Sequence, residues 1–199
     1  DGTRTHLNID YCNENIKTVY HELFDEALER YNAKQTRSDR KIKDYYEKIR
    51  SSKQEKPFRE IILQVGGKGN MNADTENGEL AKQVLDEYYQ GFQERNPQLR
   101  VFSAHLHMDE ATPHLHIDFV PFTTGSKRGL DTRVSLKQAL ATQGFKGGSR
   151  GDTEWSQWVQ SEKEQLAAVM ERYGIEWEHK GTHEKHLSVL DYKKQEREK

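Results

Sequence analysis

Apolar and polar residues alternate in two runs near the middle of the chain, separated by a short sequence that favours a turn. The first run alternates Phe102, Ala104, Leu106 and Met108 with Val101, Ser103, His105 and His107. The second alternates Leu115, Ile117 and Phe119 with His114, His116 and Asp118. A period of two predicts strands with one apolar and one polar face. Because residues 109–113 have turn composition, we predict a hairpin with four histidines and Asp118 on one face.

Longer periods predict helices elsewhere in the chain. Apolar residues recur every three or four positions over 16–33, 78–95, 135–142 and 154–173, and a very polar helix is predicted over 39–51, after Ser38 as N-cap. Shorter alternating or apolar runs predict strands over 3–10, 58–65 and 175–178, and a charged helix ends the chain. With a hairpin at its centre, this order predicts an α+β fold with a largely antiparallel sheet flanked by helices.

The histidine-rich face of the predicted hairpin is a candidate metal site. Cross-strand neighbours lie about 5 Å apart at Cβ, close enough for several imidazoles to share one ion. A single strand histidine is usually only a half-buried polar residue, but four crowded imidazoles favour a metal or catalytic role. Glu110 in the turn could lean over the site, and Asp118 could accept a hydrogen bond from a ligating imidazole. The spacing matches neither a zinc finger nor a helical zinc-protease motif.

Composition limits the class of protein. The chain has 199 residues, a net charge of −2 and one cysteine, Cys12, which excludes an internal disulfide and suits a reducing compartment. No run approaches the ~20 apolar residues of a membrane span, and no secretory signal is present, so we expect a cytoplasmic protein. Because the chain begins at Asp1 without methionine and ends in a charged run, we expect a piece of a longer protein, cut at both ends.

Local basic segments, rather than net charge, would have to attract nucleic acid. Two polar loops are candidates: they hold Lys127, Arg128, Arg133, Lys146 and Arg150. The second loop, 144–153, is either a mobile substrate-gripping segment or disordered. In the 39–51 helix, Tyr45 and Tyr46 lie among basic residues and could stack on bases, although a charged helix is most often a solvated face. The glycine-rich 66–70 segment lacks the spacing of a phosphate loop and is interpreted as a flexible loop.

The run His107-Met108-Asp109-Glu110-Ala111-Thr112-Pro113-His114-Leu115-His116 resembles the metal motif of MobV-type plasmid relaxases, members of the HUH endonuclease superfamily. The opening Arg4-Thr5-His6-Leu7-Asn8 is similar to that family's second motif, and the segments 42–45 and 120–122 also fit. The resemblance spans most of the chain, which we interpret as a single relaxase domain over 1–199.

The resemblance implies roles for individual residues. It implies that His107, His114 and His116 bind a divalent metal, with Glu110 as a further ligand or as a group that orients the nucleophile. Arg4, His6 and Asn8 would lie near DNA, and His105 falls outside the motif. The family's His-Asn-x-x-Arg motif, which holds its nucleophilic histidine, is absent here and is expected upstream of Asp1. If a tyrosine attacks instead, Tyr45 and Tyr46 are candidates, with packing or stacking as their alternative role.

The implied function is a DNA relaxase for plasmid or transposon mobilisation. It would nick one strand at an origin of transfer by metal-assisted transesterification, keep the 5′ end covalently bound and release a 3′ hydroxyl. Manganese is the expected metal, with magnesium as the alternative, and single-stranded or hairpin origin DNA is the expected partner, with transfer-machinery proteins as further candidates. Two alternatives remain open: an origin-binding fragment without a nucleophile, and a metal-dependent hydrolase of a small substrate.

Overall fold

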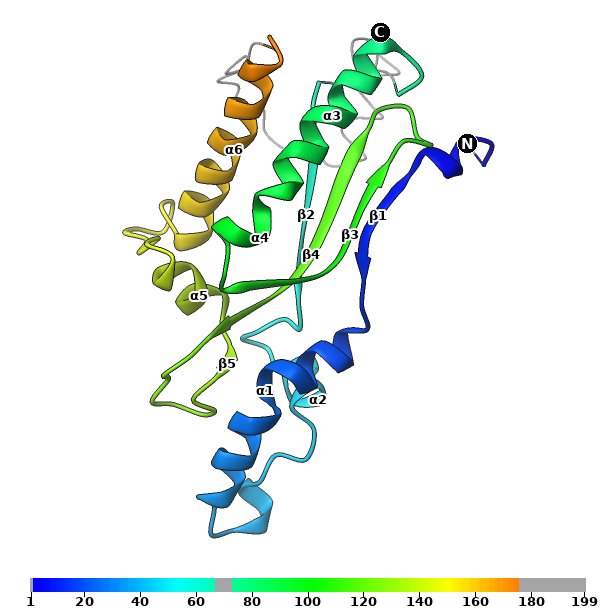
Figure 1. The fold of residues 1–199 in the computed structure, drawn as a ribbon. Coiled ribbons are helices and arrows are strands. Elements are labelled where there is room, and N and C mark those ends of the chain that lie inside the picture. The colour runs from blue at the N-terminus through cyan, green and yellow to red at the C-terminus, as the bar shows by residue number, and fades with distance from the viewer. Residues whose placement is uncertain (1, 67–72, 176–199) are drawn as a thin grey trace, which may run out of the picture.

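The computed structural model describes residues 2–66 and 73–175 and places a single antiparallel sheet among helices (Figure 1). The first half contains a 3-10 turn (Thr5–Leu7), β1 (Ile9–Asn13), α1 (Ile16–Ala33), a second 3-10 turn (Ser38–Arg40), α2 (Tyr45–Arg50) and β2 (Arg59–Gln64). The second half contains α3 (Glu76–Gln90), α4 (Phe92–Arg95), β3 (Leu99–His107), β4 (His114–Thr123), β5 (Arg133–Val134), α5 (Leu136–Thr142) and α6 (Glu154–Arg172).

The sheet has the order β1-β3-β4-β2, and every neighbouring pair of strands is antiparallel. The short β5 pairs with the far end of β4, beyond the four-stranded part. The predicted α+β class with a largely antiparallel sheet is therefore confirmed, and the predicted hairpin forms its two central strands.

One face of the sheet packs against α3, α4, α5 and α6 and forms the main core. Its centre includes Leu106, Leu115 and Phe119 from the hairpin and Leu85 and Trp158 from the helices, all fully buried. A buried polar network crosses this core: Glu162 of α6 accepts hydrogen bonds from Tyr88 Oη at 2.6 Å and Asn96 Nδ2 at 3.0 Å. The Trp158 indole in turn donates to Asn96 at 2.8 Å, so the carboxylate is buried with its partners in place.

The opposite face of the sheet carries the histidines, and it is covered only in part. Val120 lies on the same face as His116 because side chains alternate along β4, and it is fully buried. It packs with Phe102 in a second cluster built from α1 and α2, which includes Phe24 and Ile49. Helices α1 and α2 therefore cover one end of this face, away from the β3–β4 turn (Figure 1).

The predicted helix over 16–33 is confirmed without change, and those over 135–142 and 154–173 are confirmed to within one residue. The predicted helix 78–95 starts earlier, at Glu76, and divides into α3 and α4 at Gly91. Residues 176–178 of the expected strand, the terminal helix and most of the 66–70 loop lie outside the described residues.

Three predicted elements differ from the structure, each for a local reason. The predicted helix over 39–51 was wrong in its first half. The Asn32 side chain donates to the Ile42 carbonyl and accepts from the Ile42 N–H, which holds that segment extended. The strand 3–10 starts only at Ile9, because 3-10 hydrogen bonds close residues 4–8 into a turn. The alternation predicted Val101 on the histidine-bearing face. A bulge between Val101 and Ser103 turns its side chain into the main core instead.

Candidate metal centre

His107, His114 and His116 meet at the turn end of the central hairpin. His107 ends β3 and pairs in register with His114, which begins β4, and His116 lies two positions further along the same face. The ring centroids are 5.1 Å apart for His107 and His114, 5.0 Å for His107 and His116, and 4.9 Å for His114 and His116. One ligand nitrogen from each ring lies within 4.8 Å of the others, so the three can hold one ion.

Each of these imidazoles has an acceptor near its Nδ1. His114 Nδ1 lies 3.0 Å from the Thr112 carbonyl oxygen, which can only accept, so this nitrogen carries the proton. His107 Nδ1 lies 3.7 Å from Asp109 Oδ1, and His116 Nδ1 lies 3.7 Å from Glu60 Oε2. The hydrogen bond to Thr112 fixes the tautomer of His114 and leaves its Nε2 as the ligand atom. The two carboxylates are beyond hydrogen-bond length but lie on the Nδ1 side of their rings. The donor set and its surroundings therefore suit a divalent metal.

Glu110 approaches the histidines from the other direction. Its side chain extends from the exposed turn, and Oε2 lies 3.5 Å from His114 Nε2, the nitrogen that the Thr112 contact leaves unprotonated. Asp109 and Glu60 are near Nδ1 atoms, whereas Glu110 is near an Nε2 atom. Glu110 is thus on the side of the rings where an ion would bind.

Electrostatics at the site favour the neutral form of His116. Burial lowers the pKa of His116; Glu60 opposes this shift, and the neighbouring His114 and His107 add to it. Beside it, burial and the adjacent Glu60 carboxyl raise the pKa of Asp118 to about 7. Glu60 and Asp118 pair across β2 and β4, and they form a carboxyl pair behind His116. Metal ligation requires the neutral imidazole, so a lowered pKa assists binding at neutral pH.

The comparisons with known proteins agree with this arrangement. A family model described as plasmid recombination enzyme, Mob_Pre, matches residues 1–194. The chain belongs to the plasmid recombination enzyme family. No protein of curated function matches the sequence.

Two solved structures share the fold of this plasmid recombination enzyme. Both are MobM relaxase domains bound to 22-nucleotide origin DNA of plasmid pMV158, with manganese bound, in crystals at pH 5.5 and pH 6.8. The first is 20% identical and covers 98% of this chain and 83% of its own, with a TM-score of 0.50. The second is 21% identical and covers 98% and 82%, also with a TM-score of 0.50.

In this family member the opening motif supports the turn of the hairpin. Asn8 Oδ1 accepts a hydrogen bond from the Met108 backbone N–H at 2.6 Å, and Thr5 Oγ1 donates to Asp109 Oδ2 at 3.4 Å. The hydrogen bond from Asn8 is the main cause of a lowered pKa at Asp109. Asn8 therefore fixes the residues that join His107 to Glu110, a supporting role that the sequence pattern did not indicate.

The other sequence-predicted residues are divided among three regions. Arg4 and His6 lie in or beside the first 3-10 turn, close to Asn8 and the hairpin turn. Lys127 and Arg128 are exposed in the β4–β5 loop at the far end of β4, and Arg133 begins β5, with its Nε donating to Ser126 Oγ at 2.8 Å. Lys146 and Arg150 are exposed between α5 and α6. The structure thus brings only the opening motif to the histidines.

Tyr45 is not placed for catalysis. It is buried at 8% exposure in the α1–α2 cluster, and its hydroxyl accepts the Val134 backbone N–H at 3.0 Å. Val134 pairs with Phe122, eight residues along β4 from His114, which corresponds to about 26 Å at ~3.3 Å per residue. Tyr45 therefore packs the second cluster, and its position gives no support to the nucleophilic role predicted from the sequence.

Two further features of the site concern residues outside the family motif. His105 contacts Asp10 Oδ1 through Nδ1 at 2.7 Å and Ser103 Oγ through Nε2 at 2.9 Å, and it stays outside the triad, as expected. Glu60 was missed, because the strand predicted over 58–65 was not divided into two faces. The alternation of Phe58, Glu60, Ile62 and Gln64 with Arg59, Ile61 and Leu63 was the available signal.

None of the helices in the described part of the chain combines the length and apolar composition needed to cross a bilayer.

Proposed function

We propose that this protein is a DNA relaxase that nicks one strand at an origin of transfer for plasmid mobilisation, and that His107, His114 and His116 hold its metal. The observation that carries the proposal is the orientation of the triad. Three imidazoles converge within 4.8 Å while each Nδ1 faces an acceptor outside the cluster. A purely structural cluster would have no reason to place all three acceptors on the Nδ1 side.

Glu110 completes the proposed ligand set. Three nitrogen ligands suit zinc, nickel or copper by affinity, whereas a carboxylate moves the preference towards manganese and magnesium. We favour manganese, which is the metal bound in the MobM relaxase domains with this fold. Such a cation stabilises negative charge on a phosphodiester oxygen as it develops in the transition state.

The protein's own residues supply position and access. Asn8 holds the β3–β4 turn, and the Thr112 carbonyl orients the His114 ring. The proposed ligands are therefore positioned before the substrate binds. The sheet beside them is open: Ile62, which pairs with His116, is 58% exposed. A DNA strand lying on this open face would bring one phosphate to the triad, and the MobM relaxase domains of this fold bind origin DNA.

In the proposed reaction, a nucleophile attacks the scissile phosphorus and the bond to the 3′ oxygen breaks. The 3′ oxygen leaves as a hydroxyl after taking up a proton, and the 5′ phosphate remains esterified to the protein. Because the phosphodiester energy is retained, the step can be reversed to rejoin DNA. We place this activity in the bacterial cytoplasm, where its plasmid substrate resides.

The test begins with the metal. Titration of manganese, followed by electron paramagnetic resonance, should show one site in the parent and a loss of at least 10-fold in affinity in His114→Ala. His105→Ala is the matched control and should bind as the parent does. The native full-length protein should then relax a supercoiled plasmid carrying its origin with manganese, and His114→Ala should not. Failure of the native protein to nick this plasmid with manganese or magnesium would overturn the proposal.

A further inference from the structure

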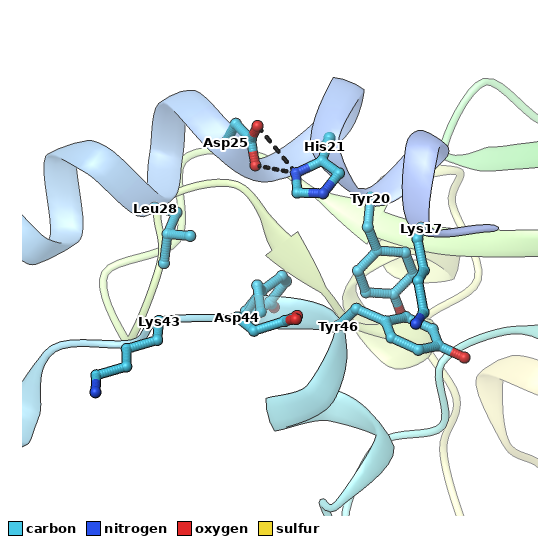
Figure 2. Close-up of a pocket in the computed structure, with 9 residues that line it drawn as sticks. Lys17, Tyr20, His21, Asp25, Leu28, Lys43, Asp44 and Tyr46 are labelled. Atoms are coloured by element: carbon cyan, nitrogen blue, oxygen red, sulfur yellow. Dashed lines mark hydrogen bonds and ion pairs between the residues drawn. The ribbon is translucent and has the colours of Figure 1, made fainter. Parts of the chain in front are cut away.

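A cavity of about 160 Å³ lies between α1 and the segment that leads into α2, away from the metal centre (Figure 2). An engineered protein cavity of about 150 Å³ holds a benzene ring, so this space suits a single six-membered ring. Neither the triad nor its supporting residues line it. The family motif over 42–45 runs along its edge, and the proposed chemistry gives that motif no role.

The walls of the cavity combine an aromatic ring with two cations. Tyr46 presents a half-buried ring, and Lys17 Nζ lies 5.6 Å from the centre of that ring. Lys43 lies at the end of the cavity opposite Tyr46, and Leu28 lies near the same end as Lys43 (Figure 2). Aromatic rings flanked by cations along a groove are the usual means of holding single-stranded DNA, because bases stack and phosphates pair with lysine.

Two carboxylates also line the cavity, but both are engaged. Asp44 Oδ1 accepts the Glu47 backbone N–H at 3.0 Å as the cap of α2. Both oxygens of Asp25 face His21 Nδ1, at 2.9 and 3.1 Å. Asp44 therefore keeps its second oxygen as an acceptor towards the cavity (Figure 2), which could accept from the amino group of a base.

The location of the cavity connects it to the metal centre. Helices α1 and α2 cover the far end of the histidine-bearing face, so a strand that follows the open face from the triad meets them. The neighbouring Tyr45 hydroxyl is bonded to Val134, near the end of β4, and the spacing along β4 from His114 is about 26 Å. At about 3.4 Å for each stacked nucleotide, this distance corresponds to roughly eight nucleotides.

We propose that this cavity binds a pyrimidine base of single-stranded DNA about eight nucleotides from the scissile phosphate, with Tyr46 as the stacking surface and Lys17 and Lys43 as phosphate contacts. The proposal rests on the proposed relaxase function, since it assumes that DNA crosses the histidine-bearing face. It adds a second point of attachment, which sets how far the strand can slide past the triad.

The test measures binding without metal, so that it does not depend on the triad. The full chain is titrated in EDTA against a fluorescein-labelled 30-nucleotide single strand of random sequence, and anisotropy gives the dissociation constant. Tyr46→Leu, which keeps apolar volume but cannot stack, should weaken binding about 10-fold. Tyr46→Phe should bind as the parent does. Circular dichroism and thermal melting establish that each variant is folded.

Salt dependence tests the two lysines. Lys43→Ala should reduce the slope of log affinity against log salt by about 0.7, the value for one phosphate contact on a single strand. Lys48→Ala is the matched control, since Lys48 is exposed on α2 outside the cavity and should leave the slope unchanged. A strand containing 5-iodouracil should cross-link under ultraviolet light to a peptide that contains Tyr46.

The outcomes separate the two proposals. If the parent binds the strand but a folded Tyr46→Leu binds equally well, the cavity proposal is overturned and the relaxase function stands. If the parent binds no single strand in EDTA, the cavity proposal falls; the nicking assay with manganese then decides the relaxase function by itself.

Discussion

Glu60 Oε2 lies 3.7 Å from Nδ1 of His116, behind the ring rather than on its Nε2 side. The two residues come from adjacent strands, β4 and β2, and Glu60 is two positions from the residue that pairs with His116. This contact joins the edge strand of the sheet to the metal centre. In the proposed relaxase, the edge strand would therefore support the metal centre although it contributes no ligand.

We predict that Glu60→Ala lowers manganese affinity by about 10-fold or more, because loss of a carboxylate behind a ligating histidine frees its ring. The manganese affinity of Glu60→Gln should lie between those of Glu60→Ala and the parent, since the amide oxygen of Gln can still accept from Nδ1. Manganese titration measures both. Glu94→Gln, an exposed change on α4, is the control, and equal affinity in Glu60→Ala and the parent would contradict the role given to Glu60.

Asn8→Ala should loosen the turn between the two central strands. It removes the acceptor for the Met108 N–H and the hydrogen bond to Asp109. We expect a loss of about 1 kcal/mol in unfolding free energy, faster amide exchange at Met108 and weaker manganese binding. Asn13→Ala, at the exposed end of β1, is the comparison. Unchanged exchange at Met108 would show that the turn holds without Asn8.

Tyr45→Phe should separate packing from catalysis. The change leaves the buried Val134 N–H without its acceptor, so we expect a loss of about 1–3 kcal/mol in stability. Origin nicking, measured at a temperature where the variant is folded, should continue at the parent rate. Abolished nicking in a folded Tyr45→Phe protein would restore the tyrosine as a catalytic candidate.

Glu162→Ala should destabilise the protein strongly while sparing the metal centre. It removes the carboxylate that pairs with Arg95 and accepts from Tyr88 and Asn96 inside the core. We expect the free energy of unfolding, measured with urea, to fall by about 3 kcal/mol, since the partners remain buried without compensation. Glu164→Ala, on the exposed side of α6, should cost little. Manganese affinity of the folded fraction should stay at the parent value in both variants.

Local patterns predicted the helices and strands that bury one apolar face and expose the other. The alternation over 101–119 predicted the central hairpin and its histidine face, and the three-to-four spacing over 16–33 predicted α1 with its bounds. These features depend on burial alone, which is directly encoded in the order of apolar and polar residues.

Features that depend on a distant partner were not visible in the same way. Asn32 holds Ile42 extended, and Asn8 holds the β3–β4 turn from a hundred residues away. The bulge beside Phe102 shifts the alternation by one residue, because the two cores lie on opposite faces and both need an apolar side chain there. A single sequence gives the residue types at such positions but not the pairings between them.

The partial cover over the histidine-bearing face makes that face asymmetric along its length. The triad lies at its open end and α1 and α2 stand at the other. A single DNA strand has a 5′ and a 3′ direction, and only one of the two directions would place the correct side of the scissile phosphate towards the attacking group. On this fold, strand polarity would fix the direction in which a bound strand crosses the face before any base is recognised.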